Sequence, residues 1–272
     1  MKLDLGISPC PNDTFIFYHL SKQGVAGNPV RLVFADVEEL NRRAIEEARH
    51  AITKLSYAAM ARLGDRYRLL QTGGALGRGC GPILISYDPM SADEARGRMR
   101  RVLIPGKYTT ANLLMHLYLN DHGADASRIE FIPVRYDEII PALNSGDADF
   151  GVIIHEERFT YKDHGLSAVQ DLGAWWETAT GLPIPLGCIA VRNDVPEHLI
   201  PAIENGIRSS LQQARREPAS TWNFIKEHSQ SLEDDVIRAH INLYVNELSL
   251  DVDAEGRQAI DELFRRAEAA GI

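Results

Sequence analysis

His155 is the side chain of this sequence best suited to move a proton. It follows an apolar stretch (residues 150–154) that is typical of a buried strand, and Glu156 comes directly after it. Open α/β proteins bind their ligands at the carboxyl ends of such strands. Imidazole accepts protons near neutral pH because its ordinary pKa is about 6.5, so we expect a general base here. The alternative is a hydrogen-bonded histidine at the edge of the core. The spacing of a His-Glu-x-x-His zinc helix is missing, so we expect no metal site.

Three further polar segments each follow a predicted strand and enter a predicted helix. Parallel strands bring their carboxyl ends to one edge of a sheet, so we expect these segments and His155 to meet in a single crevice. The free N–H groups and the dipole at the start of a helix attract a carboxylate or a phosphate. Taken one at a time, the same residue types also suit helix caps or, for the lysine, a solvated surface charge. The segments are Asn12, Asp13 and Thr14; Lys54, Leu55 and Ser56; and Thr109, Thr110 and Ala111.

Cys10 stands between two prolines, which stiffen the connection around it. A cysteine nucleophile needs a partner base, and none is identifiable for Cys10 in the sequence. Together with Cys80 and Cys188 it makes three widely spaced cysteines, which match neither a disulfide framework nor paired zinc ligands. We therefore expect Cys10 to be structural and the protein to be reduced.

Strands and helices alternate over the first two thirds of the chain. Several apolar runs are continuous, as strands buried on both faces require, so the sequence predicts an α/β fold with mostly parallel sheets. Apolar residues recur at helical spacing in the last third, which predicts a helical C-terminal segment whose final helix is capped by Asp253. The stripes are Leu199, Ile203, Ile207 and Leu211, then Ile237, Ile241, Tyr244 and Leu248. The predicted strands are 3–8, 30–37, 51–56, 67–72, 82–87, 101–104, 130–136 and 150–155, and the predicted helices among them are 15–20, 38–48, 56–63, 110–120 and 137–145.

Two segments are expected to carry the chain between two lobes. One follows the glycine-rich stretch 73–81, and the other is Gly-Leu-Pro-Ile-Pro-Leu-Gly at 181–187. This layout makes residues 1–87 plus 183–272 a large discontinuous lobe and residues 88–182 a small one, with the active-site cleft between them. A single (βα)₈ barrel is the alternative that suits the chain length, and the helical last third argues against it.

Charge and composition exclude several classes of protein. The formal net charge is −9 and no basic block is present, so a nucleic acid is not an expected partner. No apolar run reaches the roughly 20 residues that span a bilayer, and no stretch of signal-peptide type follows Met1. We expect a cytoplasmic protein that binds a small carboxylate and no membrane, and the oligomeric state stays open.

Six motifs are spread over nearly the whole chain. They are Ser-Pro-Cys-Pro-Asn-Asp-Thr-Phe (8–15), Thr-Lys-Leu-Ser-Tyr (53–57), Gly-Gly-Ala-Leu-Gly-Arg-Gly (73–79), Val-Ile-Ile-His-Glu (152–156), Asp-Leu-Gly-Ala-Trp-Trp-Glu (171–177) and Gly-Leu-Pro-Ile-Pro-Leu-Gly (181–187). In combination they resemble the 1,4-dihydroxy-6-naphthoate synthases of the futalosine route to menaquinone.

The resemblance implies a two-lobed fold like that of type II periplasmic binding proteins. It implies a lyase that converts cyclic dehypoxanthine futalosine to 1,4-dihydroxy-6-naphthoate and releases dihydroxyacetone, with His155 as the proton acceptor. Lys54-Leu55-Ser56 and Thr110-Ala111 correspond to substrate-binding segments of the family. A retro-aldol cleavage needs a base and hydrogen-bond donors, so we expect neither a cofactor nor a metal. A chorismate dehydratase-like sibling and a solute-binding protein of the same fold remain as alternatives.

Overall fold

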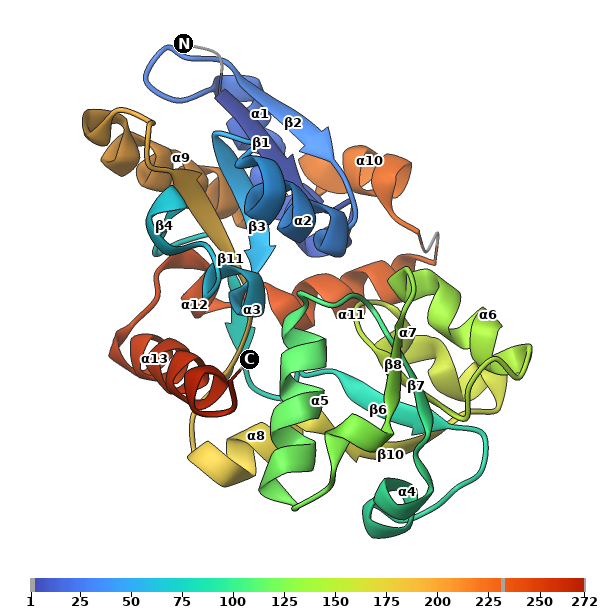
Figure 1. Cartoon of the computed structure of the whole chain (residues 1–272). Coiled ribbons are helices and arrows are strands. Elements are labelled where there is room, and N and C mark those ends of the chain that lie inside the picture. The colour runs from blue at the N-terminus through green and yellow to red at the C-terminus, as the bar shows by residue number, and fades with distance from the viewer. Residues whose placement is uncertain (1–2, 231–232, 272) are drawn as a thin grey trace.

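The computed structural model describes residues 3–230 and 233–271, which form alternating strands and helices and then a helical last third (Figure 1). The strands are β1 (Leu3–Ile7), β2 (Val30–Phe34), β3 (Ile52–Ser56), β4 (Tyr67–Leu69), β5 (Ala75–Gly77), β6 (Ile83–Ser86), β7 (Arg101–Ile104), β8 (Glu130–Pro133), β9 (Phe150–Ile153), β10 (Ser167–Asp171) and β11 (Ile184–Arg192). The helices are α1 (Pro11–Gln23), α2 (Val37–Glu47), α3 (Tyr57–Met60), α4 (Ala92–Arg98), α5 (Thr110–Asp121), α6 (Ile139–Asn144), α7 (Glu157–Thr160), α8 (Leu172–Thr180), α9 (Ile200–Arg216), α10 (Ala219–His228), α11 (Asp234–Tyr244), α12 (Glu247–Leu250) and α13 (Ala254–Ala269).

These strands make two separate sheets, and we call each sheet with its helices a lobe. The first lobe has the strand order β2-β1-β3-β11-β4, with β5 also paired to β11, and the second has the order β10-β6-β9-β7-β8. Both sheets are mixed. The βα units pair in parallel, whereas β11 runs antiparallel to β3, β4 and β5, and β6 runs antiparallel to β9 and β10. The α/β prediction is confirmed, and the barrel alternative is wrong because the strands do not close into one sheet.

The chain passes from the first sheet to the second between β5 and β6, and it returns between α8 and β11. The strand β6 already belongs to the second sheet, so the chain enters that sheet at Ile83. The division of the lobes at residues 88 and 182 stays a prediction. Most of the observed strands end one to three residues before the predicted end, and the strands β5, β10 and β11 were not predicted.

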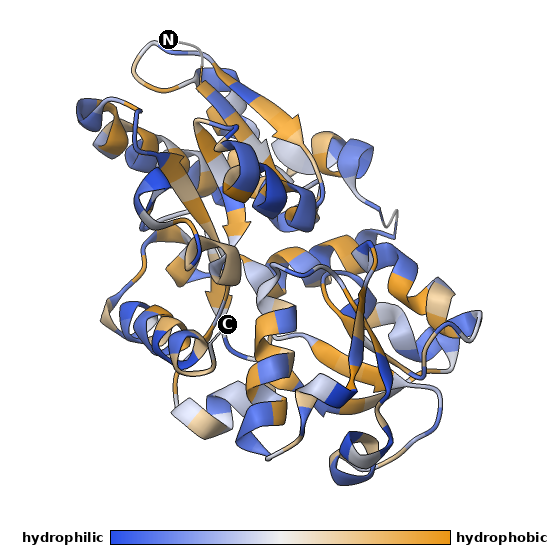
Figure 2. Ribbon diagram, in the orientation of Figure 1, coloured by the Kyte–Doolittle hydropathy of each residue, from blue (hydrophilic) through white to orange (hydrophobic). Residues whose placement is uncertain are grey.

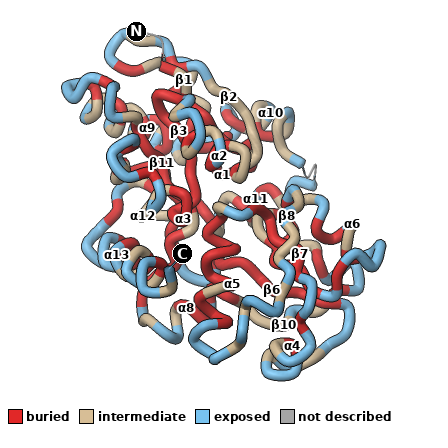
Figure 3. Tube along the Cα trace, viewed as in Figure 1, coloured by how far each residue is buried: buried red, intermediate tan, exposed pale blue. Residues whose placement is uncertain are grey.

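The apolar faces of these elements form the core. In the first lobe α1 packs against α9 and β2, and the predicted stripe of α9 (Ile203, Ile207 and Leu211) is fully buried in the same core as the strand β1. The inner strands β3, β6 and β9 are buried throughout, whereas the edge strands β2, β8 and β10 are only partly buried (Figures 2 and 3). Asp253 caps α13, since its Oδ1 accepts a hydrogen bond from Gly256 N at 2.8 Å, as predicted. No described helix combines the length and the apolar character needed to cross a membrane.

The start of α1 differs from the prediction that Asn12, Asp13 and Thr14 precede a helix as its caps. Pro11 is already the first helical residue and Cys10 occupies the cap position, so the three polar residues lie inside the first turn. Proline suits this place because its ring fixes a helical φ and its missing N–H is not needed there. The structure therefore places these side chains where they reach other segments rather than their own helix end.

Candidate active site

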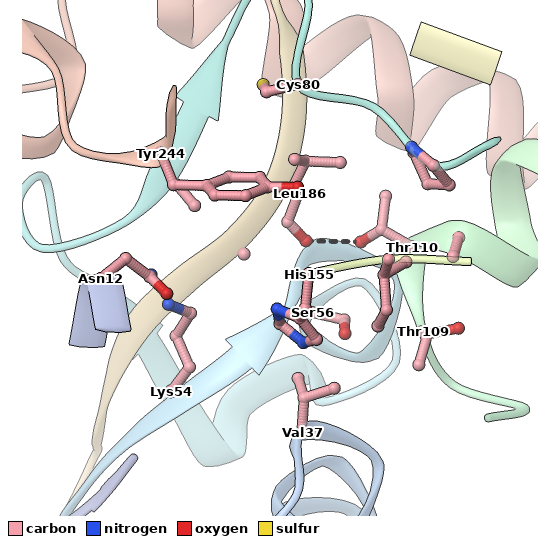
Figure 4. Close-up of a pocket in the computed structure, with 15 residues that line it drawn as sticks. Asn12, Val37, Lys54, Ser56, Cys80, Thr109, Thr110, His155, Leu186 and Tyr244 are labelled. Atoms are coloured by element: carbon pink, nitrogen blue, oxygen red, sulfur yellow. Dashed lines mark hydrogen bonds between the residues drawn. The ribbon is translucent and has the colours of Figure 1, made fainter. Parts of the chain in front are cut away.

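One cavity is lined by residues that follow strands of both lobes (Figure 4). His155 follows β9 of the second sheet, whereas β3 of the first sheet supplies Lys54 and Ser56. In Figure 4, Asn12 and Lys54 lie on one side of the cavity and the start of α5 on the other. Seven of the predicted site residues line it: Asn12, Lys54, Ser56, Thr109, Thr110, Ala111 and His155. Parallel pairing brings strand ends to one edge within each sheet, and these edges of the two sheets face the same cavity.

Three predicted residues do not line the cavity. Leu55 is fully buried in the core, because alternate side chains of a strand point to opposite faces. The Thr14 hydroxyl donates within α1 to the carbonyls of Cys10 and Pro11, at 3.0 and 3.2 Å. Asp13 is fully buried and contacts Lys54 instead of open space.

Asp13 is the centre of a buried polar network at the cavity wall. Its Oδ2 accepts hydrogen bonds from Ser8 N (3.1 Å) and Ser8 Oγ (2.7 Å). Its Oδ1 accepts from Asn12 Nδ2 (2.9 Å) and from the Lys54 ammonium. Lys54 is only 6% exposed, so the reading as a solvated surface charge is wrong. The ion pair places a positive charge beside the cavity while the buried carboxylate compensates it.

The first turn of α5 offers backbone donors rather than free hydroxyl hydrogens. Thr109 Oγ1 donates to Gly106 O (2.8 Å) and caps the helix by accepting from Asn112 N (3.2 Å). Thr110 Oγ1 donates to Leu186 O at 2.7 Å, which ties α5 to β11 (Figure 4). The first N–H groups of a helix have no acceptor within the helix. The N–H groups of Thr110 and Ala111 therefore suit a carboxylate or another oxygen of a ligand.

Ser56 is held by a side chain from α2. Its backbone N donates to Asn41 Oδ1 at 2.9 Å, and its Oγ accepts from Asn41 Nδ2 at 3.0 Å. The same Nδ2 lies 3.3 Å from the carbonyl oxygen of Tyr108, which precedes α5. Asn41 thus fixes the end of β3 against the second lobe, a role that no sequence pattern indicated.

His155 combines a strained backbone with a neutral ring. Its φ is 55°, in the left-handed region that few residues other than glycine adopt. Burial lowers the pKa of His155 to about 4, and the nearby Lys54 acts in the same direction while Asp13 opposes it. The imidazole is therefore neutral at physiological pH and has a lone pair available to accept a proton.

A second histidine, His240 of α11, lies beside this ring and was not predicted. The two rings stack with centroids 6.0 Å apart, and His240 Nε2 lies 2.9 Å from Asn12 Oδ1. Burial, followed by His155 and Lys54, lowers the pKa of His240 well below its ordinary value. Tyr244, one turn further along α11, lines the cavity. The sequence showed only the apolar stripe of this helix, in which Tyr244 counted as a core residue.

Acidic side chains next to His155 hold protons more tightly than usual. Burial raises the pKa of Glu156 to about 7, and burial together with Asp137 and Glu156 raises that of Glu157 to about 9. Cys10, His155 and Glu156 bring three potential metal-ligand atoms within 4.8 Å of one another. The thiolate that a metal binds is disfavoured, because burial and nearby carboxylates raise the pKa of Cys10. The expectation that the protein needs no metal stays a prediction.

Comparison with known proteins identifies the family. The sequence model of the family described as menaquinone biosynthesis matches residues 3–269. The chain belongs to this menaquinone-biosynthesis family. It is 48% identical to the 1,4-dihydroxy-6-naphthoate synthase of Thermus thermophilus over 274 residues, which cover 99% of this chain and 95% of that protein. The 1,4-dihydroxy-6-naphthoate synthase of Streptomyces coelicolor is 38% identical over 271 residues, which cover 99% and 94% of the two chains. The resemblance to these synthases is thus confirmed.

Solved structures confirm the fold of this menaquinone-biosynthesis chain. A crystal structure of an Archaeoglobus fulgidus protein is similar with a TM-score of 0.89 and 31% identity, over 99% of this chain and 98% of that one. The alkanesulfonate-binding protein of Xanthomonas axonopodis pv. citri is similar with a TM-score of 0.73 and 11% identity, over 99% and 93%. At that identity the likeness shows the fold alone, and it is the predicted two-lobed fold of periplasmic binding proteins.

Proposed function

We propose that this chain is a carbon–carbon lyase that converts cyclic dehypoxanthine futalosine to 1,4-dihydroxy-6-naphthoate with release of dihydroxyacetone. The names of the two relatives support the product. The observation that carries the proposal is the cavity itself, where a neutral histidine lies between a buried ammonium group and the start of α5. This set supplies the base and the oxygen-binding donors that a retro-aldol cleavage needs.

In this mechanism His155 removes the proton of a substrate hydroxyl group. The oxygen–hydrogen electrons form a carbonyl, the adjacent carbon–carbon bond breaks, and its electron pair passes into the ring system that becomes the naphthalene. Lys54 and the N–H groups of Thr110 and Ala111 bind substrate oxygens and hold the breaking bond in line with the base. Aromatisation drives the step, so the proposed reaction needs no redox cofactor and no metal.

The buried cavity also suits a reaction in which water competes for intermediates. Contacts across the lobes, such as that of Thr110 Oγ1 with the carbonyl of Leu186, enclose the substrate beside His155. All three cysteines are free and buried, which agrees with a reducing compartment and supports the proposed cytoplasmic location.

The test is turnover by the purified protein without added cofactor. Cyclic dehypoxanthine futalosine is expected to yield the dihydroxynaphthoate, followed by its ultraviolet spectrum. Chorismate, offered in parallel, is expected to remain unchanged. Substrate binding without product would favour a solute-binding protein, and turnover of chorismate would favour the sibling enzyme.

The role of His155 is tested by two matched substitutions. His155→Ala is expected to lower kcat by roughly 10²–10⁴-fold, the usual contribution of a general base, while substrate binding stays measurable by calorimetry. His164 is exposed on the surface of the second lobe, and His164→Ala is expected to keep full activity. Full activity in His155→Ala would refute the assignment of the base.

A further inference from the structure

A sulfur atom lies against the ring of the proposed base. Cys10 Sγ is 3.5 Å from His155 Nδ1, and Cys10 is 1% exposed. The other ring nitrogen, Nε2, is buried and has no hydrogen-bond partner within residues 3–230 and 233–271. The two nitrogens therefore differ: Nδ1 faces a thiol, and Nε2 is left without a protein partner on a ring that lines the cavity.

The backbones on both sides of this contact are constrained. Cys10 is flanked by Pro9 and Pro11, and its carbonyl accepts hydrogen bonds from Thr14 N (3.1 Å) and Thr14 Oγ1 (3.0 Å). His155 has a left-handed backbone, which costs a residue other than glycine on the order of 1–3 kcal/mol. The contact also joins the lobes, since Cys10 follows β1 and His155 follows β9. A contact held in this way fixes the orientation of the ring.

The thiol at this position is neutral. Burial is the largest cause that raises the pKa of Cys10 well above its usual value, and the carboxylates of Glu156 and Asp13 add to it. A neutral thiol is both a weak donor and a weak acceptor, so the contact can in principle run in either direction. The direction decides the chemistry, because a neutral imidazole carries its hydrogen on only one nitrogen. If S–H donated to Nδ1, the ring hydrogen would be on Nε2 and the ring would be no base toward the cavity.

The surroundings of the sulfur favour the other direction. A carboxyl oxygen of Glu156 lies within 4.8 Å of Cys10 Sγ, and neither Glu156 oxygen has a hydrogen-bond partner in the described part of the chain, although Oε2 lies 3.9 Å from His240 Nδ1. We infer that the S–H hydrogen turns toward this carboxyl group, which offers it an oxygen acceptor that the ring does not occupy. The lone pairs of the sulfur are then left to accept the hydrogen of Nδ1.

We propose that Cys10 is a positioning residue, whose sulfur accepts the Nδ1–H of His155 and so keeps Nε2 free to take the proton of the substrate. This inference rests on the proposed role of His155 as the base. In the reaction the substrate proton moves to Nε2, Nδ1 keeps its own hydrogen, and Cys10 neither gains nor loses a proton. The imidazolium that forms strengthens the contact, because its Nδ1–H becomes a charged donor.

The first test measures the tautomer without reference to activity. The protein is labelled with ¹⁵N at its nine histidines, and the signals of His155 are assigned by their loss in His155→Gln. In the unmodified protein the hydrogen is expected on Nδ1. Cys10→Ala is expected to move a large part of it to Nε2, and Cys10→Ser, which keeps an acceptor, is expected to restore Nδ1. A hydrogen on Nε2 in the unmodified protein would overturn the proposal, and this outcome does not depend on the folding of any Cys10 variant.

The second test measures kcat and KM with the same variants. Cys10→Ala is expected to lower kcat roughly fivefold or more, the effect of one lost hydrogen bond, with KM changed by less than about twofold. Cys188 is equally buried, in β11 and outside the cavity lining, so Cys188→Ala is the matched control and is expected to keep kcat and the tautomer.

The outcomes separate this inference from the function it rests on. If His155→Ala keeps activity although the Nδ1 tautomer depends on Cys10, the base assignment fails. If His155→Ala is inactive but Cys10→Ala keeps both kcat and the tautomer, the role of Cys10 is wrong. Activity lost on treatment with a chelator and restored by a divalent metal would show that Cys10, His155 and Glu156 hold a metal, which also overturns the proposal.

Discussion

The variant Lys54→Met tests whether Lys54 stabilises the folded protein or only binds the substrate. The substitution removes the ammonium group but keeps most of the apolar stem, and it leaves the Asp13 carboxylate buried without its counter-charge. Losing one partner of a buried ion pair costs about 3–5 kcal/mol. Three hydrogen bonds to Asp13 remain, two from Ser8 and one from Asn12. We therefore expect the lower end of this range, a loss of about 3 kcal/mol in the free energy of unfolding.

The assay is urea unfolding at pH 7, followed by circular dichroism and by tryptophan fluorescence. In a thermal scan the same loss corresponds to a fall in Tm of about 6–12 °C, since 1 kcal/mol shifts Tm by about 2–4 °C in a large domain. Lys162 is exposed, so Lys162→Met is the matched control and is expected to stay within about 0.5 kcal/mol of the unmodified protein.

A double variant makes the prediction sharper. Asp13→Asn combined with Lys54→Met removes both charges, so it is expected to be more stable than Lys54→Met alone, because no uncompensated charge stays buried. If Lys54→Met loses less than about 1 kcal/mol and only KM rises, the ion pair has no structural role and the reasoning is refuted.

Three further predictions concern the base and the contacts between the lobes. Because neutral His155 is the reactive form and its pKa is about 4, the acid limb of kcat/KM is expected near pH 4, and a His155-dependent limb near pH 6.5 would contradict this. Thr110→Ala removes the hydrogen bond to β11 and is expected to lower the free energy of unfolding by about 1–3 kcal/mol. Thr110→Ser keeps the hydroxyl group, so its free energy of unfolding is expected to fall by less. Equal losses of the two variants in urea unfolding would contradict a role of this hydrogen bond. Gly106→Ala places a Cβ 2.5 Å from the Glu38 side chain of α2, at a φ of 141° that disfavours alanine, so KM is expected to rise about tenfold. The control Gly97→Ala lies at an open position in α4 and is expected to leave KM unchanged. An unchanged KM in both variants would show that the contact between Gly106 and Glu38 accommodates a methyl group.

The sequence was sufficient where a candidate residue lies at the end of a buried strand or at the start of the helix that follows it. His155, Ser56 and Thr110 were predicted to share a crevice, and the structure brings them to one cavity, because apolar strands and their carboxyl ends can be read locally. The role of Lys54 was left open, since the burial of an ammonium depends on a carboxylate 41 residues away in the chain.

Features that depend on long-range packing were not predictable. His240 lies on an amphipathic helix, and only the docking of α11 against α1 brings it to Asn12 and His155. The sequence predicts only a crossing between lobes at residues 181–187 and no strand at 184–192, yet β11 pairs with three strands of the first sheet. Eight of its nine residues are paired with neighbouring strands, and this pairing outweighs the local preference of two turn-forming residues.

The hydrogen bond between Asn12 and His240 joins positions 228 residues apart, one in the first turn of the first helix and one in the last third of the chain. At a synthesis rate of about 5–20 residues per second, roughly 10 to 45 s separate the appearance of these two residues at the ribosome. Until α11 has emerged from the ribosome, Asn12 of the nascent chain lacks its partner His240, and the cavity lacks Tyr244 from its lining. The proposed active site is therefore completed late in translation, because a chain that ends before α11 lacks both His240 and Tyr244.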